Sequence, residues 1–296
     1  MKKRALLYII IASVLWGTSG LFVHALVPFG FSSIQMTALR GIVSAVAFVV
    51  YALLRDRTLF RTTAKEFFTF ALSGVFIFGT ASSYYASMQA SSVSTAVVLM
   101  YTAPIFVMAF SVAFFGEKMN FLKGLSVVCM LIGCALVSGV IGGMTFNPVG
   151  ILFGLASGVL YSAYNIFAKI EMMHHSNPVS ASLYCFLVMG IVAFVCSNPP
   201  ELFSLIAQAP SKIIPLGIGI GICTSVLPYF LYTLSLRDLP AGTATTLGII
   251  EPMAATVFSV AFLGERLSVL SVCGILLILG AVMILNKAEA NKGESI

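Results

Sequence analysis

Two charged residues inside otherwise apolar stretches are the groups in this sequence best placed to do chemistry. Glu251, followed directly by Pro252, lies near the middle of an apolar run, and Arg40 lies inside another. A charge in the hydrocarbon of a bilayer costs about 2.5 kcal/mol or more, so it is retained where it has a partner, a cavity or a function. We expect Glu251 to take up a proton or a cationic group, beside a helix that Pro252 kinks or loosens.

Arg40 suits the recognition of a carboxylate, because its guanidinium can donate two parallel hydrogen bonds. Arg40 and Glu251 fall at comparable depths in their runs. They could therefore pair with each other, or present opposite charges to a zwitterionic substrate. The alternatives are structural: Arg40 as a clamp between helices, and Glu251 bonded to the backbone that Pro252 leaves free.

Aromatic and small polar residues in other apolar runs could line a cavity around these charges. Trp16 and Ser19 share a helix face by their spacing, as Tyr161 and Tyr164 do. Such residues offer stacking and cation–π contacts, although ordinary packing explains any one of them equally well. The candidate substrate-binding residues are Trp16, Ser19, Arg40, Tyr84, Tyr101, Tyr161, Tyr164, Asn165, Tyr229, Tyr232 and Glu251; Glu251 is also the candidate coupling residue, and Pro104, Pro228 and Pro252 are predicted helix kinks.

Other motifs argue against enzymatic activity. The segment Gly17-Thr18-Ser19-Gly20 matches the GxSG pattern of intramembrane serine proteases, but His24 is five residues from Ser19 and on another helix face. There is no phosphate-binding GxxxxGK[ST] loop, and the six cysteines and His174-His175 form no ligand cluster. We therefore expect no catalytic residues, no metal and no cofactor.

The composition is that of a multi-pass helical membrane protein. Of the 296 residues, 59% are hydrophobic and only 9% are charged, far below the charged share of soluble domains. The net charge of +6 does not indicate nucleic-acid binding, because the basic residues sit at helix ends. The expected partners are the lipid bilayer and a small-molecule substrate, with the protein acting as a monomer or a homodimer.

Continuous apolar runs predict ten transmembrane helices joined by short linkers. The basic residues between the runs fall thirteen on one side and two on the other, which predicts that both termini are cytoplasmic. The predicted spans are 5–26, 32–54, 67–88, 94–115, 122–139, 148–170, 178–197, 214–236, 241–263 and 267–286.

The chain also carries an internal duplication. Shifting 95–117 by 148 residues aligns it with 243–265, and 11 of the 23 positions are then identical. Each half contains an odd number of spans, so the second half enters the membrane from the opposite side, the inverted-repeat arrangement of many secondary transporters. The predicted units are a first repeat at 5–139, a second at 148–286 and a cytoplasmic tail at 287–296.

These features together resemble the EamA family of the drug/metabolite transporter superfamily. The resemblance rests on the ten-helix pattern, Trp16-Gly17, Arg40, Glu251-Pro252, and a Gly-Glu pair ending the fourth helix of each half, at Glu117 and Glu265. It implies a multi-pass protein of the bacterial inner membrane that is an exporter or permease of small metabolites, often amino acids or organic amines.

The expected function is thus secondary active export by alternating access, with proton coupling through Glu251. An uncoupled facilitator or an exporter of lipophilic compounds would have the same fold, and the intramembrane protease is the alternative from another class. Glu117 and Glu265 are expected to set loop geometry or form salt bridges at the two membrane faces, or to act in gating.

Overall fold

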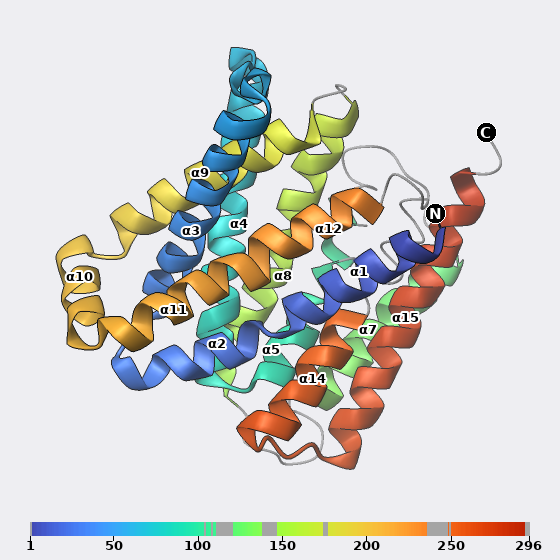
Figure 1. The fold of residues 1–296 in the computed structure, drawn as a ribbon. Helices are drawn as coiled ribbons and strands as arrows, with labels where there is room; N and C mark the ends of the chain where they lie inside the picture. The colour runs from blue at the N-terminus through green and yellow to red at the C-terminus, as the bar shows by residue number, and fades with distance from the viewer. Residues whose placement is uncertain are drawn as a thin grey trace.

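The computed structural model of this chain describes residues 2–103, 105–107, 109–110, 121–137, 147–173, 177–235, 248 and 250–293. Within these ranges all regular secondary structure is helical, and the helices pack into one bundle (Figure 1). The helices of the first half are α1 Lys2–Gly17, α2 Ser19–Leu26, η1 Val27–Phe29, α3 Ser33–Arg55, η2 Arg57–Phe60, α4 Ala64–Ala90, α5 Val93–Met100 and α7 Phe121–Val137. Those of the second half are α8 Pro148–Met173, α9 Pro178–Cys196, α10 Pro199–Gln208, α11 Pro210–Gly221, the π-helical η3 Ile222–Val226, α12 Leu227–Ser235, α14 Ile250–Leu263 and α15 Val269–Gly293.

Among the described residues, six helical segments are long and apolar enough to cross a membrane, and shorter apolar helices lie at the four remaining predicted spans. Many of their large apolar side chains are exposed, including Leu54, Val195 and Val269. Lipid tails solvate such surfaces, so the chain is a multi-pass membrane protein. The number of crossings and the side of each terminus stay predictions.

Polar residues in the connections fix where several helices begin. Ser32 and Thr63 each form a capping box, with Gln35 and Glu66 at the start of α3 and α4. The Asn177 side chain accepts hydrogen bonds from the first turn of α9. These caps satisfy backbone N–H groups that have no partner within the helix, so the sequence itself places the helix starts.

Helices from equivalent places in the two halves run antiparallel and contact each other. At one end of the α3–α9 pair, Gln35 donates to the carbonyl of Ser197 at 3.4 Å; at the other, the Tyr184 hydroxyl donates to the carbonyl of Phe60 at 2.8 Å. The pair crosses at Gly41 and Gly190, where a Cβ on Gly190 would lie 2.9 Å from the Gly41 carbonyl oxygen. Only glycine allows the two backbones to approach so closely.

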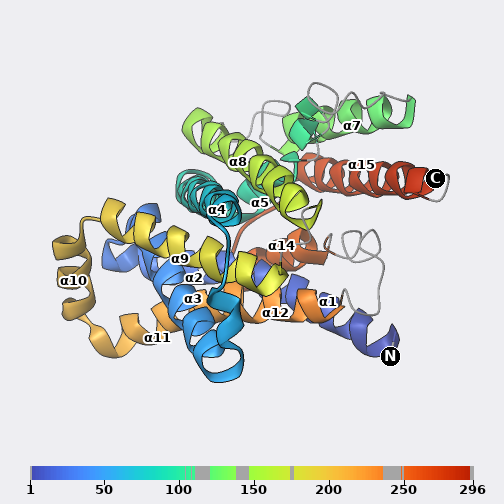
Figure 2. The same cartoon turned by 90° about the horizontal axis from the view of Figure 1, so that it is seen from above.

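The same relation holds for two further pairs of helices. The beginning of α5 lies beside the residues that follow α14, and its end lies beside Gly248, which precedes α14. Helices α7 and α15 pack along each other and stand together at one edge of the bundle (Figure 2). The core is therefore built where the two halves meet.

The structure differs from the sequence prediction at three helices. The first predicted span is interrupted at Thr18, where the Thr18 and Ser19 hydroxyls donate to the carbonyls of Leu15 and Trp16 in the preceding turn. Such back-bonding often bends helices. The eighth span begins earlier, at Pro210, and changes to π-helical winding ahead of Pro228.

The segment after α9, predicted to be a linker, forms the helix α10. Pro199 occupies the first helical position, where its missing N–H costs no hydrogen bond, and Glu201 lies in the first turn, where the helix dipole favours an acid. Leu202 is buried and anchors α10 to the bundle.

Candidate functional site

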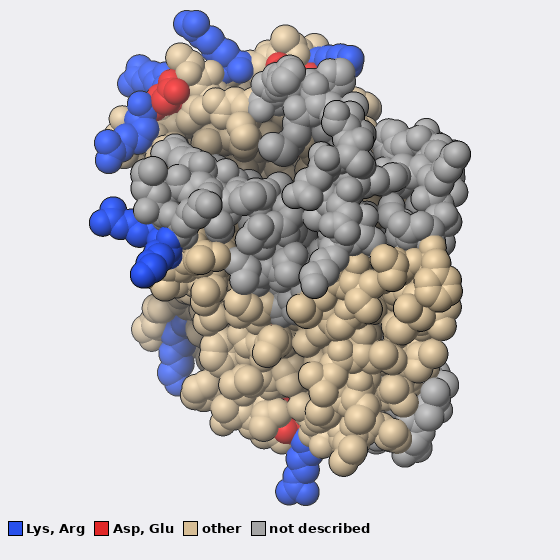
Figure 3. All heavy atoms as spheres, turned by 90° about the vertical axis from the view of Figure 1, so that its right-hand side faces the viewer, with Lys and Arg blue, Asp and Glu red and all other residues tan. Residues whose placement is uncertain are grey.

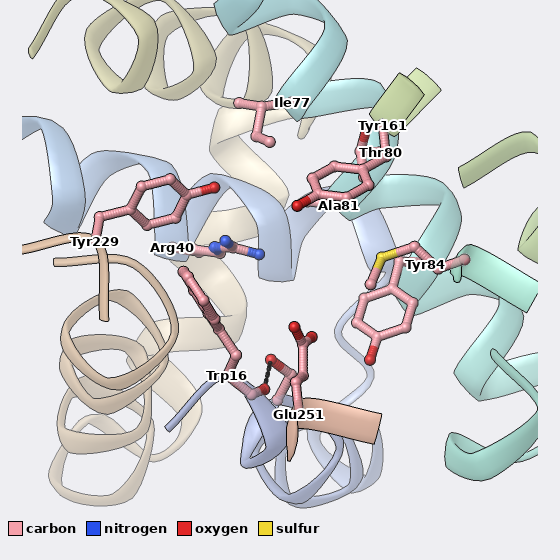
Figure 4. A pocket seen from close by; sticks show the side chains of 11 residues that line it. Trp16, Arg40, Ile77, Thr80, Ala81, Tyr84, Tyr161, Tyr229 and Glu251 are labelled. Atoms are coloured by element: carbon pink, nitrogen blue, oxygen red, sulfur yellow. Dashed lines mark hydrogen bonds between the residues drawn. The ribbon is translucent and has the colours of Figure 1, made fainter. Parts of the chain in front are cut away.

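A cavity inside the bundle brings together the two intramembrane charges. Its lining comes from eight elements of both halves, and Arg40 and Glu251 point toward the same space (Figure 4). The volume open to the centres of water molecules is about 70 Å³. A bound water needs about 10–15 Å³ on this measure, so the cavity has room for roughly five waters or a small metabolite. The lining residues are Trp16, Ser19, Arg40, Ile77, Thr80, Ala81, Tyr84, Met100, Tyr161, Tyr229 and Glu251.

Arg40 is held by three hydrogen bonds to neighbouring helices. Its Nε donates to Ser225 Oγ at 2.6 Å, one terminal nitrogen donates to the Tyr85 hydroxyl at 3.3 Å, and the other donates to the Thr224 carbonyl at 3.1 Å. That carbonyl lies four residues before Pro228, which has no N–H to offer it. A guanidinium has five N–H groups, so two of them make no bond to any described residue and are left for a ligand.

Glu251 is held by a tyrosine at the C-terminal end of α5. The Tyr101 hydroxyl lies 2.9 Å from Glu251 Oε2 and 3.0 Å from the carbonyl oxygen of Gly248. Within the described part of the chain, no ion pair joins Glu251 to Arg40: the hydrogen bonds of Arg40 go to Ser225, Tyr85 and Thr224 instead. The two opposite charges therefore share a cavity without neutralising each other directly.

Close packing of α1 on α14 sets the position of Trp16 relative to Glu251. A Cβ on Gly17 would lie 2.9 Å from the Ala254 Cβ, so glycine at this position lets the helices meet. The Trp16 ring stands beside Arg40 in Figure 4 and contacts Tyr229 edge-on at 5.5 Å between centroids. This aromatic wall offers a face on which a cationic group can bind.

Tyr84 is the one lining residue whose buried hydroxyl has no hydrogen-bond partner among the described atoms. Its side chain is 4% exposed and lies on α4, one turn after Thr80 and Ala81. Leaving such a hydroxyl unpaired costs about 1–3 kcal/mol, which a polar ligand or an ordered water in the cavity would recover.

An apolar core and the carboxylate of Glu265 adjoin the helices α2 and α5 that contribute to the cavity. Buried side chains of α2, α4, α5 and α11 form this continuous apolar core. The Glu265 carboxylate accepts hydrogen bonds from the Val93 N–H at 2.7 Å, the Ser94 N–H at 3.4 Å and the Ser94 hydroxyl at 2.8 Å. Glu265 thus caps the first turn of α5, where the helix dipole favours a negative charge.

Two matches to a family model cover nearly the whole chain. The EamA-like transporter family matches residues 3–139 and again residues 148–287. The chain belongs to this family. The sequence-based identification is therefore confirmed, and the protein is an EamA-like transporter.

Relatives of this EamA-like transporter match over most of their length. An uncharacterized transporter of Archaeoglobus fulgidus is 28% identical, covering 93% of this chain and 94% of the relative. The transporter YwfM of Bacillus subtilis is 25% identical, covering 95% and 93%. The threonine/homoserine exporter RhtA of Salmonella typhimurium is 26% identical, covering 68% and 64%. A solved crystal structure shares the fold with a TM-score of 0.63 at 17% identity, covering 96% of this chain and 97% of that one.

Seven of the eleven candidate residues from the sequence line the cavity of the EamA-like transporter, and four do not. Three of these four contact a lining residue without lining the cavity themselves: Tyr101 bonds to Glu251, the Tyr164 ring stacks on Tyr161, and the Tyr232 ring packs against Trp16. Asn165 follows Tyr164 on α8 and is also absent from the lining. The predicted kink at Pro104, together with Glu117 and His174-His175, lies outside the described residues.

Four lining residues were missed by the sequence prediction: Ile77, Thr80, Ala81 and Met100. Three of them could have been found, because Ile77, Thr80 and Ala81 precede Tyr84 at helical spacings of seven, four and three. Met100 gave no signal, since an apolar side chain in an apolar helix does not reveal which way it points.

Proposed function

We propose that this EamA-like transporter exports a small amino acid or organic amine by alternating access, with Glu251 as its proton-coupling group. The observation that carries the proposal is the presence of Arg40 and Glu251 in one small cavity, without a bond between them. A zwitterion fits this arrangement. Its carboxylate accepts from the two N–H groups of Arg40 that bond to no described residue, and its ammonium group binds Glu251 beside the Trp16 ring.

The substrate class is supported by cavity size and by one relative. A volume of about 70 Å³ for water centres suits a metabolite rather than a bulky drug. RhtA, which matches part of this chain, is named a threonine/homoserine exporter. An organic amine without a carboxylate would use Glu251 and leave Arg40 as a clamp between α3 and η3.

Proton coupling follows from competition at Glu251. The ionised carboxylate holds an ammonium group, and a proton on the same carboxylate removes that attraction. A proton that enters from the periplasm and binds Glu251 therefore releases the cationic group of the substrate there. Proton entry and substrate exit then alternate at one side chain, which is the exchange that secondary export needs.

Alternating access is supported by the relation of the two halves. Equivalent helices of the two halves run antiparallel, as in α3 with α9 and α5 with α14. This direction is expected when a pseudo-two-fold axis in the membrane plane relates the two halves. We propose ten spans in two inverted five-helix repeats, 5–139 and 148–286. The cavity is formed within one chain, so a monomer suffices, and a homodimer would contain two independent sites.

Orientation is supported by the basic residues. Arg55, Arg57, Arg61 and Lys65 are all exposed around the α3–α4 connection, and Lys and Arg gather mainly toward that end of the molecule (Figure 3). Cytoplasmic connections carry an excess of Lys and Arg. We propose that this end is cytoplasmic, that both termini and the tail at 287–296 lie there, and that the membrane is the bacterial inner membrane.

The alternative functions have less support. A lipophilic-compound exporter fits poorly with a small cavity that carries two charges. A protease needs a base beside Ser19, but the Ser19 hydroxyl donates to the Trp16 carbonyl at 2.7 Å. An uncoupled facilitator would have the same cavity and differs only in its response to pH.

The test is substrate binding and flux with matched variants. A panel of amino acids and organic amines is screened by thermal stability in detergent, where a ligand at 100 times its Kd adds about 2.7 kcal/mol. A stabilising compound is then followed in proteoliposomes with an imposed pH gradient. Glu251→Gln and Arg40→Lys change the site; Glu201→Gln and Arg55→Lys make the same changes at exposed positions and serve as controls.

Loss of binding in both site variants, with both controls unaffected, supports a zwitterionic substrate. Loss in Glu251→Gln alone supports an amine. Unchanged binding, flux and pH dependence in Glu251→Gln would refute the proposed role of this carboxylate.

A further inference from the structure

Tyr101 faces two hydrogen-bond acceptors but has one hydroxyl hydrogen. Its oxygen lies 2.9 Å from Glu251 Oε2 and 3.0 Å from the carbonyl oxygen of Gly248. The side chain does not line the cavity, so a bound substrate does not need to contact it. The hydroxyl therefore joins the Glu251 carboxylate to the backbone just before α14.

Pro252 leaves the Gly248 carbonyl able to accept a second hydrogen bond from this hydroxyl. In an α-helix the carbonyl of residue 248 accepts from the N–H of residue 252, and proline has none. The Glu251 N–H lies 2.9 Å from the Gly248 oxygen and supplies one bond. A carbonyl oxygen has two lone pairs, and the Tyr101 hydroxyl is placed to occupy the second.

We propose that Tyr101 is a positioning residue that links the protonation of Glu251 to the hydrogen bonding of the Gly248 carbonyl at the start of α14. The inference rests on the proposed coupling role of Glu251. When Glu251 is ionised, the Tyr101 hydroxyl donates to Oε2, since a bond to a charged acceptor is about twice as strong as one to a neutral acceptor.

Protonation reverses the direction of this bond. The proton bound at Oε2 is donated to the Tyr101 oxygen, and the Tyr101 hydroxyl hydrogen rotates to the Gly248 carbonyl. No covalent bond of Tyr101 breaks, its hydrogen bond changes acceptor, and the only proton gained is the one on the carboxyl group. The Gly248 carbonyl, which lies just before α14, thus gains the Tyr101 hydroxyl as a donor when Glu251 is protonated and loses it when Glu251 is ionised.

Among the described residues that line the cavity, Glu251 is the carboxylic acid, and its neighbours are groups that ordinarily do not titrate near neutral pH. Arg40 on α3, Tyr84 on α4, Tyr161 on α8 and Tyr229 on α12 line the same space, and α1 and α2 contribute Trp16 and Ser19. Arginine and tyrosine side chains ordinarily keep one protonation state around neutral pH, and tryptophan and serine do not titrate there. A change in pH therefore acts on Tyr101 through Glu251.

The test is the pH dependence of transport in proteoliposomes over roughly pH 5 to 9, where a midpoint reports the group that must titrate. Tyr101→Phe removes the hydroxyl that favours the carboxylate. We expect the midpoint to rise by about one pH unit, which corresponds to a tenfold change in proton binding. Tyr184→Phe is the matched control, because it also removes a hydroxyl bonded to a backbone carbonyl, at 2.8 Å from Phe60 and away from the cavity.

A second variant is expected to shift the midpoint in the opposite direction. Pro252→Ala supplies an N–H to the Gly248 carbonyl, so the Tyr101 hydroxyl loses its acceptor in the protonated state. We expect the midpoint to fall. A purely structural role of Tyr101 and Pro252 predicts loss of activity or stability in both variants, but no opposite shifts.

The outcomes separate the two proposals. If Glu251→Gln keeps the pH dependence of the unmodified protein, the proposed function is wrong. If Glu251→Gln abolishes the pH dependence but Pro252→Ala and Tyr101→Phe keep the unmodified midpoint, the role of Tyr101 alone is overturned. Should Tyr101→Phe fail to fold, the Pro252→Ala midpoint still decides, because only the Tyr101 link predicts that it falls.

Discussion

The crossing of α3 and α9 gives the sharpest stability prediction, through Gly190→Ala. The new Cβ would lie 2.9 Å from the Gly41 carbonyl oxygen and 3.0 Å from its carbon, whereas ordinary contacts are 3.4–4 Å. Both atoms belong to the backbone of a helix, so no side chain can turn aside. The two helices must therefore separate by about half an ångström at the crossing.

Overpacking of this kind costs about 1–3 kcal/mol. The same displacement acts on Arg40, which directly precedes Gly41 and bonds to Ser225 at 2.6 Å. We expect Gly190→Ala to unfold at a lower temperature in detergent and to bind substrate more weakly, because Arg40 is moved relative to Glu251.

The matched control is Gly280→Ala in α15, where a Cβ would meet nothing within 4 Å. Alanine there gains up to about 1 kcal/mol of helix propensity, so its melting temperature is expected to stay equal or rise. Thermal unfolding of both variants and the parent protein is measured under one condition. If Gly190→Ala melts at or above the temperature of Gly280→Ala, the close contact of the two backbones does not limit stability and the reasoning is refuted.

Three further predictions follow from single contacts. Arg40→Lys keeps the charge but cannot reach Ser225, Tyr85 and Thr224 together, so substrate affinity is expected to fall about tenfold or more with folding retained, measured by thermal-shift titration against Arg55→Lys. Glu265→Gln weakens the cap on α5 by about 1.5–3 kcal/mol. Val23 on α2 is buried in the same apolar core as Val93, so a membrane-impermeant thiol reagent should modify Val23→Cys faster when Glu265 is replaced by Gln than when it is intact. An unchanged rate would argue against a role of Glu265 in keeping this core packed. Glu171 lies just beyond the predicted span 148–170, and burial raises its pKa above the ordinary 4.5, partly offset by a hydrogen bond from Ser73. The folded state thus binds this proton more tightly than the unfolded state, so stability falls as pH rises above about 4.5, and melting curves of Glu171→Gln should lack that component.

The helices and the two charged residues were predictable from the sequence because both depend on local composition. Apolar runs predict helices in a bilayer, and a charge such as Arg40 or Glu251 inside one of them is visible without any knowledge of packing. The repeat was visible for the same reason, as a similarity within the chain. The position of Tyr84 on a shared helix face also follows from spacing alone.

The partners of these residues were not predictable, because they are set by packing between distant segments. The target of Glu265 is the start of α5, more than 170 residues away in the chain, and it is a pair of backbone N–H groups that no side-chain pattern reveals. The role of Tyr101 depends likewise on a carbonyl that Pro252 leaves without its helical donor. The break at Thr18 arises from hydroxyl groups that could as readily have faced a neighbouring helix.

The pairing of α7 with α15 has a consequence for the order in which the chain is assembled. The buried face of α7, with Met130 and Gly133, packs against Ile275 and Ile278 of the last helix. Helix α7 ends at Val137 and α15 begins at Val269, so at synthesis rates of about 5–20 residues per second α7 waits on the order of ten seconds in the membrane before its partner is made. During that interval lipid covers its contact face. Synthesis of α15, rather than insertion of the earlier cavity helices, therefore completes this part of the core.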